Sequence, residues 1–231
     1  SQQDYTHLTI LIDTSSSMRS SIDDVRESAL KLLSDQESLG KPLTISLGIF
    51  PDRDNSSANS TWGSGYHFIN VEEASGIVRN ISASGGTPMC DAIGNMSATV
   101  AGKVFSMIAS EQPEKILFAI VTDGEEGHSR EFTIPDICRM VTHNEDTYNW
   151  EFLYVGSNQN AYSTGKQMGI KAGKALSFAN SKDGLHAAMQ AVSSAILRYR
   201  QNGAPHANQF FTSADHEFQA DRGASASPVS G

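Results

Sequence analysis

Four near-continuous runs of apolar and β-branched residues are spaced along the chain and predict buried β-strands. They cover residues 7–12, 43–50, 115–122 and 150–155. A strand that is buried on both faces shows such an unbroken run, whereas a strand with one solvent-exposed face alternates apolar and polar residues. Weaker runs at 66–71 and 175–178 predict strands at the edges of the same sheet.

Stretches with apolar residues three and four positions apart lie between these runs and predict helices. The first carries Ile22, Val25, Ala29, Leu32 and Leu33, and the others cover 88–104, 135–141, 158–168 and 182–200. Strands and helices alternate along the chain. This alternation predicts a doubly wound α/β fold, with a mostly parallel central sheet and helices on both faces.

All of these elements fall within residues 1–200, which are expected to form one domain. Residues 201–231 mix Gly, Ala, Ser, Asn and Pro with little periodicity. They are expected to form a flexible tail, or a segment that orders on a partner, with only Phe210, Phe211 and Phe218 as anchors. Residues 51–65 form a polar insertion that is too short to be a domain.

The composition narrows the classes of function. The chain of 231 residues has 17 Lys and Arg against 26 Asp and Glu, a net charge of −9 that opposes nucleic-acid binding. It lacks the run of apolar residues that a membrane span needs, and its first residues do not resemble a secretory signal. Cys90 and Cys138 are the only cysteines. Such sparse usage predicts free thiols in a reducing compartment, the cytoplasm.

Polar segments stand at three places where the expected elements begin or end. Asp13-Thr-Ser15-Ser-Ser17 follows the first strand, Gly85-Gly86-Thr87 precedes the helix that starts at Pro88, and Asp123 follows the third strand. Ligands of an open parallel sheet bind beyond the carboxyl ends of its strands. Residues 13, 15 and 17 alternate in a turn, so their side chains can converge on one point, and the paired glycines would let Thr87 approach it.

These segments offer only hard oxygen donors: two carboxylates, Asp13 and Asp123, and the hydroxyls of Ser15, Ser17 and Thr87. Oxygen ligands suit Mg²⁺, with Mn²⁺ and Ca²⁺ as alternatives, and disfavour zinc or copper. So few charged ligands would leave one coordination position vacant or filled by water. A carboxylate from another molecule could take that position.

The three segments together resemble the metal-ion-dependent adhesion site of the von Willebrand factor A (vWA) domain. The matching sequence segments are Leu-Ile-Asp-Thr-Ser-Ser-Ser-Met at 11–18, Gly-Gly-Thr-Pro-Met-Cys-Asp-Ala-Ile at 85–93 and Ile-Val-Thr-Asp-Gly-Glu at 120–125. The resemblance covers about residues 5–200. Residues 152–161 and 168–170 are similar to the stand-alone intracellular vWA proteins of bacteria and phages.

The resemblance implies a metal-dependent protein-binding module and a role for each residue. Ser15, Ser17 and Thr87 would coordinate the metal directly, and Asp13 and Asp123 would coordinate it directly or through water. An Asp or Glu of a partner protein would complete the octahedron. No catalytic residue is implied.

Other functions and simpler interpretations stay open at this point. Asp13 with the serines after it could be no more than a helix N-cap. A Mg²⁺-dependent phosphoryl-transfer hydrolase would use Asp13 as nucleophile, but such enzymes of the haloacid dehalogenase type need a second Asp where this chain has Ser15. An assembly protein could hold the same ion at a subunit contact.

Several polar residues near the three segments have two interpretations. Asp91 could accept hydrogen bonds behind the metal ligands or could favour the start of its helix. Glu125, Glu126 and His128 could line the rim of the site, but a solvated loop is the preferred interpretation. Trp62 could contact a partner or fold over the domain.

Overall fold

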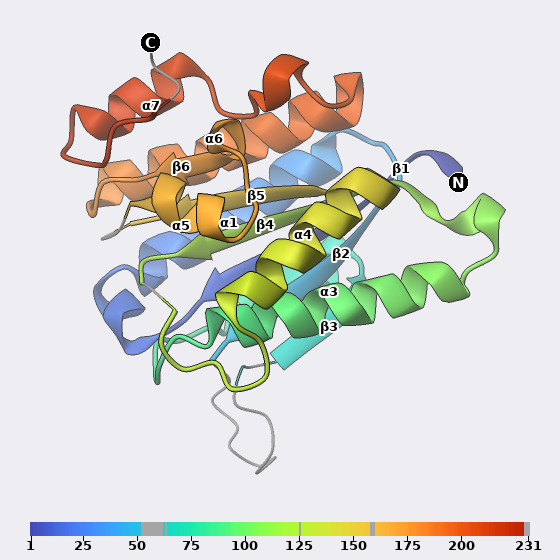
Figure 1. Cartoon of the computed structure of the whole chain (residues 1–231), viewed down its shortest axis with the longest axis horizontal. Helices are drawn as coiled ribbons and strands as arrows, with labels where there is room; N and C mark the ends of the chain where they lie inside the picture. Colours follow the sequence, from blue (N-terminus) through green and yellow to red (C-terminus); the bar gives the residue numbers. More distant parts are fainter. Residues whose placement is uncertain (52–61, 63, 125, 158–159, 229–231) are drawn as a thin grey trace.

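A six-stranded sheet forms the centre of the molecule, with helices on both of its faces (Figure 1). The computed structural model describes residues 1–51, 62, 64–124, 126–157 and 160–228. The strands are β1 (Gln2–Asp13), β2 (Leu43–Phe50), β3 (Ser64–Ile69), β4 (Pro113–Thr122), β5 (Glu151–Gly156) and β6 (Ala175–Ser177). Their order is β3-β2-β1-β4-β5-β6, and only β3 runs antiparallel to its neighbour. The predicted α/β fold is therefore confirmed.

The helices divide into two layers. The main helices are α1 (Ile22–Ser38), α2 (Val71–Val78), α3 (Met89–Ser106), α4 (Ile134–Tyr148), α5 (Ala161–Gln167), α6 (Lys182–Asn202) and α7 (Ser213–Ala220). Short 3-10 turns occupy Ser16–Ser20, Ala109–Glu111, Ala172–Lys174 and His206–Asn208. Helices α1, α2 and α6 share one hydrophobic cluster with the sheet, and α3 and α4 share the other.

Strand β1 explains the unbroken apolar runs of the sequence. Leu8 and Ile10 belong to the cluster beneath α1 and α6, whereas Leu11 belongs to the cluster beneath α3 and α4. Successive side chains of a strand point to opposite faces of the sheet, and here both faces are covered. Most positions of such a strand therefore carry an apolar residue.

Helix α2 lies where the sequence predicts only the end of an edge strand, at 66–71. The helix starts at a capping box: Asn70 Oδ1 accepts the N–H of Glu73 at 2.8 Å, and Glu73 Oε2 accepts the N–H of Asn70 at 3.0 Å. This reciprocal pair satisfies two backbone donors that a helix start leaves free. The spacing Asn-x-x-Glu is visible in the sequence and was the available signal.

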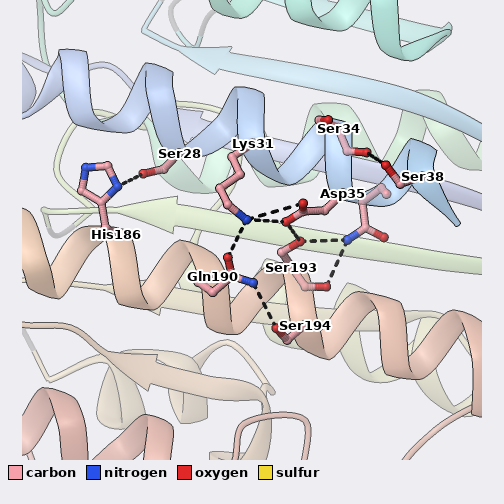
Figure 2. Close-up of polar contacts among 10 residues, drawn as sticks. Ser28, Lys31, Ser34, Asp35, Ser38, His186, Gln190, Ser193 and Ser194 are labelled. Atoms are coloured by element: carbon pink, nitrogen blue, oxygen red, sulfur yellow. Dashed lines mark hydrogen bonds and ion pairs between the residues drawn. The ribbon is translucent and has the colours of Figure 1, made fainter.

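Helices α1 and α6 contact each other through polar side chains as well as through the core (Figure 2). Lys31 Nζ donates to Gln190 Oε1 at 2.8 Å, and Gln36 Nε2 donates to the carbonyl of Ser193 at 3.0 Å. Arg200 Nη1 donates to the carbonyl of Gln36 at 2.7 Å. Hydrogen bonds have defined directions, so this seam fixes the register of α6 along α1.

Residues 201–228 pack against the domain, which differs from the flexible tail expected for 201–231. Phe210 and Phe211 are each 1% exposed, and both backbone N–H groups donate to the carbonyl of Gly173. Gln219 of α7 accepts the N–H of Ala179 and donates to the carbonyl of Gly184. The segment gave no periodic signal because α7 is short and two adjacent phenylalanines anchor it.

Most of the polar insertion at 51–65 lies outside the described residues. Trp62, which is described, is half-buried and packs against the cluster beneath α3 and α4. This favours the interpretation of an aromatic that folds over the domain. Cys90 and Cys138 are free thiols, as predicted. Among the described residues, no helix has the length and apolarity required to cross a membrane.

The docking of the C-terminal segment predicts unequal costs for its phenylalanines. Phe211→Ala should lower the free energy of unfolding by about 3–5 kcal/mol, because it leaves a cavity in the core. Phe218, which is half-buried beneath the guanidinium of Arg222, is the matched control and should cost about 1 kcal/mol when changed to Ala. Urea denaturation measures both values. Equal, small losses would contradict the packing described.

Candidate metal centre

Two carboxylates stand side by side at the carboxyl ends of neighbouring parallel strands. Asp13 is the last residue of β1, and Asp123 directly follows β4. The two strands pair in parallel with Ile12 opposite Val121, so both strands end at the same edge of the sheet. Asp13 is fully buried, and Asp123 is 7% exposed. The position is where open α/β sheets bind their ligands.

Hydrogen bonds fix the orientation of Asp13. Its Oδ1 accepts the N–H of Ser15 at 2.7 Å, and its Oδ2 accepts the hydroxyl of Thr122 at 2.7 Å. Helix α1 begins only at Ile22, so Asp13 is not its N-cap. The carboxylate instead organises the turn that carries the serines. Sequence reasoning overlooked Thr122, although a hydroxyl residue directly before Asp123 was the available signal.

The serine turn leads from Asp13 to Asp123. Ser15 Oγ lies 3.0 Å from Ser17 Oγ, and Ser17 Oγ donates to Asp123 Oδ1 at 2.8 Å. Ser15 is buried, whereas Ser17 is exposed. The structure therefore joins four of the five predicted residues in one hydrogen-bonded network, and this network reaches the surface at Ser17.

Thr87 is the fifth residue, and its loop is tied to the serine turn. Ser84 N–H donates to the carbonyl of Thr14 at 2.7 Å, and Ser16 N–H donates to the carbonyl of Gly85 at 3.0 Å. A Cβ placed on Gly124 would lie 3.5 Å from Thr87 Oγ1 and 4.0 Å from Asp13 Oδ2. Thr87 and Asp13 thus border the same small space.

The paired glycines before Thr87 have separate physical reasons. Gly85 has φ of +74°, and a Cβ there would lie 2.8 Å from the Pro51 ring. A Cβ on Gly86 would lie 2.5 Å from the ring of His128. The first glycine supplies a left-handed conformation, and the second permits a close approach. A side chain at either position would displace the loop that carries Thr87 or its neighbours.

Burial and like charge make the carboxyl pair unfavourable by itself. Burial raises the pKa of Asp123, the hydrogen bond from Ser17 lowers it, and the nearby carboxylate of Asp13 raises it again, so that together they bring it to about 6. A divalent cation would remove both penalties. The donor set of carboxylate and hydroxyl oxygens thus fits a hard cation in chemistry as well as in charge.

The loop that follows β4 is bound to the start of α3 beside Thr87. Glu126 Oε2 accepts the N–H of Cys90 at 2.6 Å, and His128 Nδ1 accepts the N–H of Thr87 at 2.9 Å. Asp91, fully buried, accepts backbone N–H groups from three consecutive residues, Arg130, Glu131 and Phe132.

These contacts add to the interpretation of three residues. Glu126 is half-buried and His128 is exposed, as expected for a solvated loop, and each also accepts a backbone N–H group at or just before the start of α3. Asp91 holds the loop after β4 and makes no described contact with the predicted ligands. Their action is through backbone N–H groups, which sequence reasoning did not detect. Glu125 lies outside the described residues.

Comparison with known proteins adds support at the level of the fold. No family model and no curated protein matches the chain. Among solved structures, the pilus adhesin SpaC from Lactobacillus rhamnosus GG, in its open conformation, is similar with a TM-score of 0.65 and 14% identity over 85% of this chain and 31% of that one. Proximal thread matrix protein 1 from the mussel byssus has a TM-score of 0.60 and 12% identity, over 82% of this chain and 47% of that one.

A second structure of the mussel protein has a zinc-occupied MIDAS motif, the metal-ion-dependent adhesion site, and matches with a TM-score of 0.55. The chain therefore has a vWA-like α/β fold. The chain spans less than half the length of these neighbours. Sequence identities of 12–14% support a shared fold only. The resemblance expected from the sequence is thus supported by the architecture.

The raised pKa of Asp123 predicts an unusual stability profile in chelator. The folded state holds this proton more tightly than the unfolded chain, so stability contributed by the group is lost as pH rises from about 4 to above 6. With chelator at about pH 7.5, Asp123→Asn should be more stable than wild type by about 1–3 kcal/mol, and the gain should shrink towards pH 4. Thermal unfolding measured across this range tests the prediction. An Asn variant that is equally or less stable at about pH 7.5 would contradict it.

Proposed function

We propose that this protein is a metal-dependent protein-binding module whose ion is held by Asp13, Ser15, Ser17, Thr87 and Asp123. The observation that carries the proposal is the convergence of the carboxylates and hydroxyls at the ends of β1 and β4. Oxygen donors favour Mg²⁺, with Mn²⁺ and Ca²⁺ as alternatives, and a zinc-occupied MIDAS in a protein of similar fold supports a divalent ion in this position. Bound there, the ion supplies positive charge and a coordination position.

The partner in this proposal supplies an Asp or Glu carboxylate. Five side-chain donors leave one position of an octahedral ion to another ligand. Asp13 and Ser15 are buried, whereas Ser17 is exposed, so a visiting group would approach from the side of Ser17. A carboxylate oxygen is a hard donor of the kind that Mg²⁺ prefers.

The charge of the chain adds a second property to the partner. A net charge of −9 repels acidic surfaces, so a partner that presents a carboxylate should surround it with basic residues. Its association rate should then fall as ionic strength rises. Nucleic acid is not an expected partner for the same reason.

A binding role is proposed in preference to catalysis. The hydrolase alternative requires a second carboxylate at position 15, where Ser15 instead contacts Ser17. A phosphatase assay with p-nitrophenyl phosphate and Mg²⁺ should therefore show no turnover that depends on Asp13. An assembly role would use the same ion at a subunit contact, and it is a special case of the binding proposal.

Metal binding can be tested at two adjacent serines. Ser17→Ala removes a proposed ligand, whereas Ser16→Ala changes a neighbouring exposed hydroxyl in the same turn. Mg²⁺ at about one hundred times its Kd should raise the free energy of unfolding of wild type and Ser16→Ala by about 2.7 kcal/mol. The Ser17 variant should bind at least about tenfold more weakly, because one coordinating oxygen is lost. Calorimetric titration and thermal unfolding measure the two effects.

The same titrations define the outcomes for the other ligands. Asp13→Ala and Thr87→Ala should also lose Mg²⁺ binding, and Mn²⁺ should compete with Mg²⁺ for one site. Loss of binding in Ser16→Ala to the same extent as in Ser17→Ala would show that the turn, not the ligand, matters. Unchanged Mg²⁺ binding in Asp13→Ala would overturn the proposed site.

The partner's chemistry can be tested with a displayed library of random peptides. Selection on the immobilised protein in Mg²⁺ should enrich peptides that contain Asp or Glu near basic residues. Enrichment should disappear in chelator and on the Thr87→Ala protein. Peptides that are enriched equally under all three conditions would contradict a metal-bridged partner.

A further inference from the structure

A cavity of about 590 Å³ lies between α2 and the sheet face formed by β2 and β3. Its wall includes Ile49 of β2, Ile69 of β3, Ile77 of α2 and Ile81 just beyond α2. Glu73, Asn80, Ser82 and the hydroxyls of Thr14 and Tyr66 are its polar groups. The size and the mainly apolar wall are those of a ligand site, since such sites commonly enclose about 300–1,000 Å³.

The cavity shares a wall with the candidate metal centre. Thr14 lines the cavity and stands between two proposed ligands, Asp13 and Ser15. The carbonyl of Thr14 accepts the N–H of Ser84 from the loop that carries Thr87. Pro51, also in the wall, is the residue that a Cβ on Gly85 would strike. Thr14 and Pro51 thus place the cavity beside the loops that carry the proposed ligands, although none of the five ligands lines it.

A glycine within α2 forms part of the same wall. Gly76 lies inside the helix, its φ is not left-handed, and a Cβ built there would meet no described atom within 4 Å. Neither backbone conformation nor close packing requires glycine at this position, although glycine destabilises a helix interior relative to other residues. Its effect is to keep space beside the helix.

We propose that the cavity receives a bulky apolar side chain from the same partner segment whose carboxylate completes the metal site. This inference rests on the proposed function and adds a second specificity element to it. The isoleucines supply the apolar surface that such a side chain would bury, and the shared wall at Thr14 places the two contacts in one peptide segment. The partner motif is an acidic residue close in sequence to Leu, Ile, Met or Phe.

The blocking variant is Gly76→Leu, which places an apolar side chain at the cavity wall. Gly102 of α3 provides the matched control, because it is also a helical glycine whose Cβ position meets no described atom within 4 Å and it does not line the cavity. Both substitutions improve helix propensity, so both variants should unfold at a higher temperature than wild type. Loss of binding by Gly76→Leu alone then reflects a blocked cavity and not misfolding.

The experiment selects displayed random peptides in Mg²⁺ on wild type, Gly76→Leu, Gly102→Leu and Asp13→Ala. Wild type and Gly102→Leu should enrich an acidic residue together with a bulky apolar one. Gly76→Leu should keep the acidic preference and lose the apolar one, and a peptide selected on wild type should bind it at least tenfold more weakly. Asp13→Ala should lose the acidic preference.

The outcomes separate the two claims. Acidic enrichment without an apolar preference, or an apolar preference that Gly76→Leu retains, overturns the cavity inference and leaves the metal function standing. Apolar enrichment that depends on Gly76 but not on Mg²⁺ or Asp13 overturns the metal-bridged function and the claim of a shared segment. No enrichment on wild type overturns both.

Discussion

The structure of the site depends on one electrostatic constraint: two carboxylates are held together at the ends of adjacent buried strands. Asp13 and Asp123 leave β1 and β4 at the same edge of the sheet, away from water and close to each other. Isolated from a cation, such a pair is costly, and the raised pKa of Asp123 expresses that cost. The two strands pair in parallel and are buried on both faces, which places the carboxylates at the same edge.

The surrounding loops follow from this constraint. Thr122 and the N–H of Ser15 orient Asp13, while Ser17 orients Asp123. Asp91 and Glu126 hold the loop after β4 against α3, which fixes the backbone at Thr87. The site is thus preorganised by hydrogen bonds to backbone groups as much as by the side chains of the proposed ligands.

Patterns that repeat along the chain made most of the fold predictable. Buried strands such as β1 and β4 read as continuous apolar runs, and the polar segments at their ends and before α3 indicated which residues meet. Features that depend on a few contacts were not predictable in this way. Helix α2 relies on one capping box, the C-terminal segment on Phe210 and Phe211, and the roles of Asp91 and His128 on backbone donors that no side-chain pattern reveals.

Anomalous X-ray diffraction from crystals grown with Mn²⁺ tests the central claim most directly. The account predicts one strong anomalous peak within about 2.0–2.4 Å of the hydroxyl oxygens of Ser15, Ser17 and Thr87, on the side of Asp13 and Asp123 that faces Ser17. Mn²⁺ found only elsewhere on the surface, with Ser17 still donating to Asp123 and no ion between the strand ends, would contradict it.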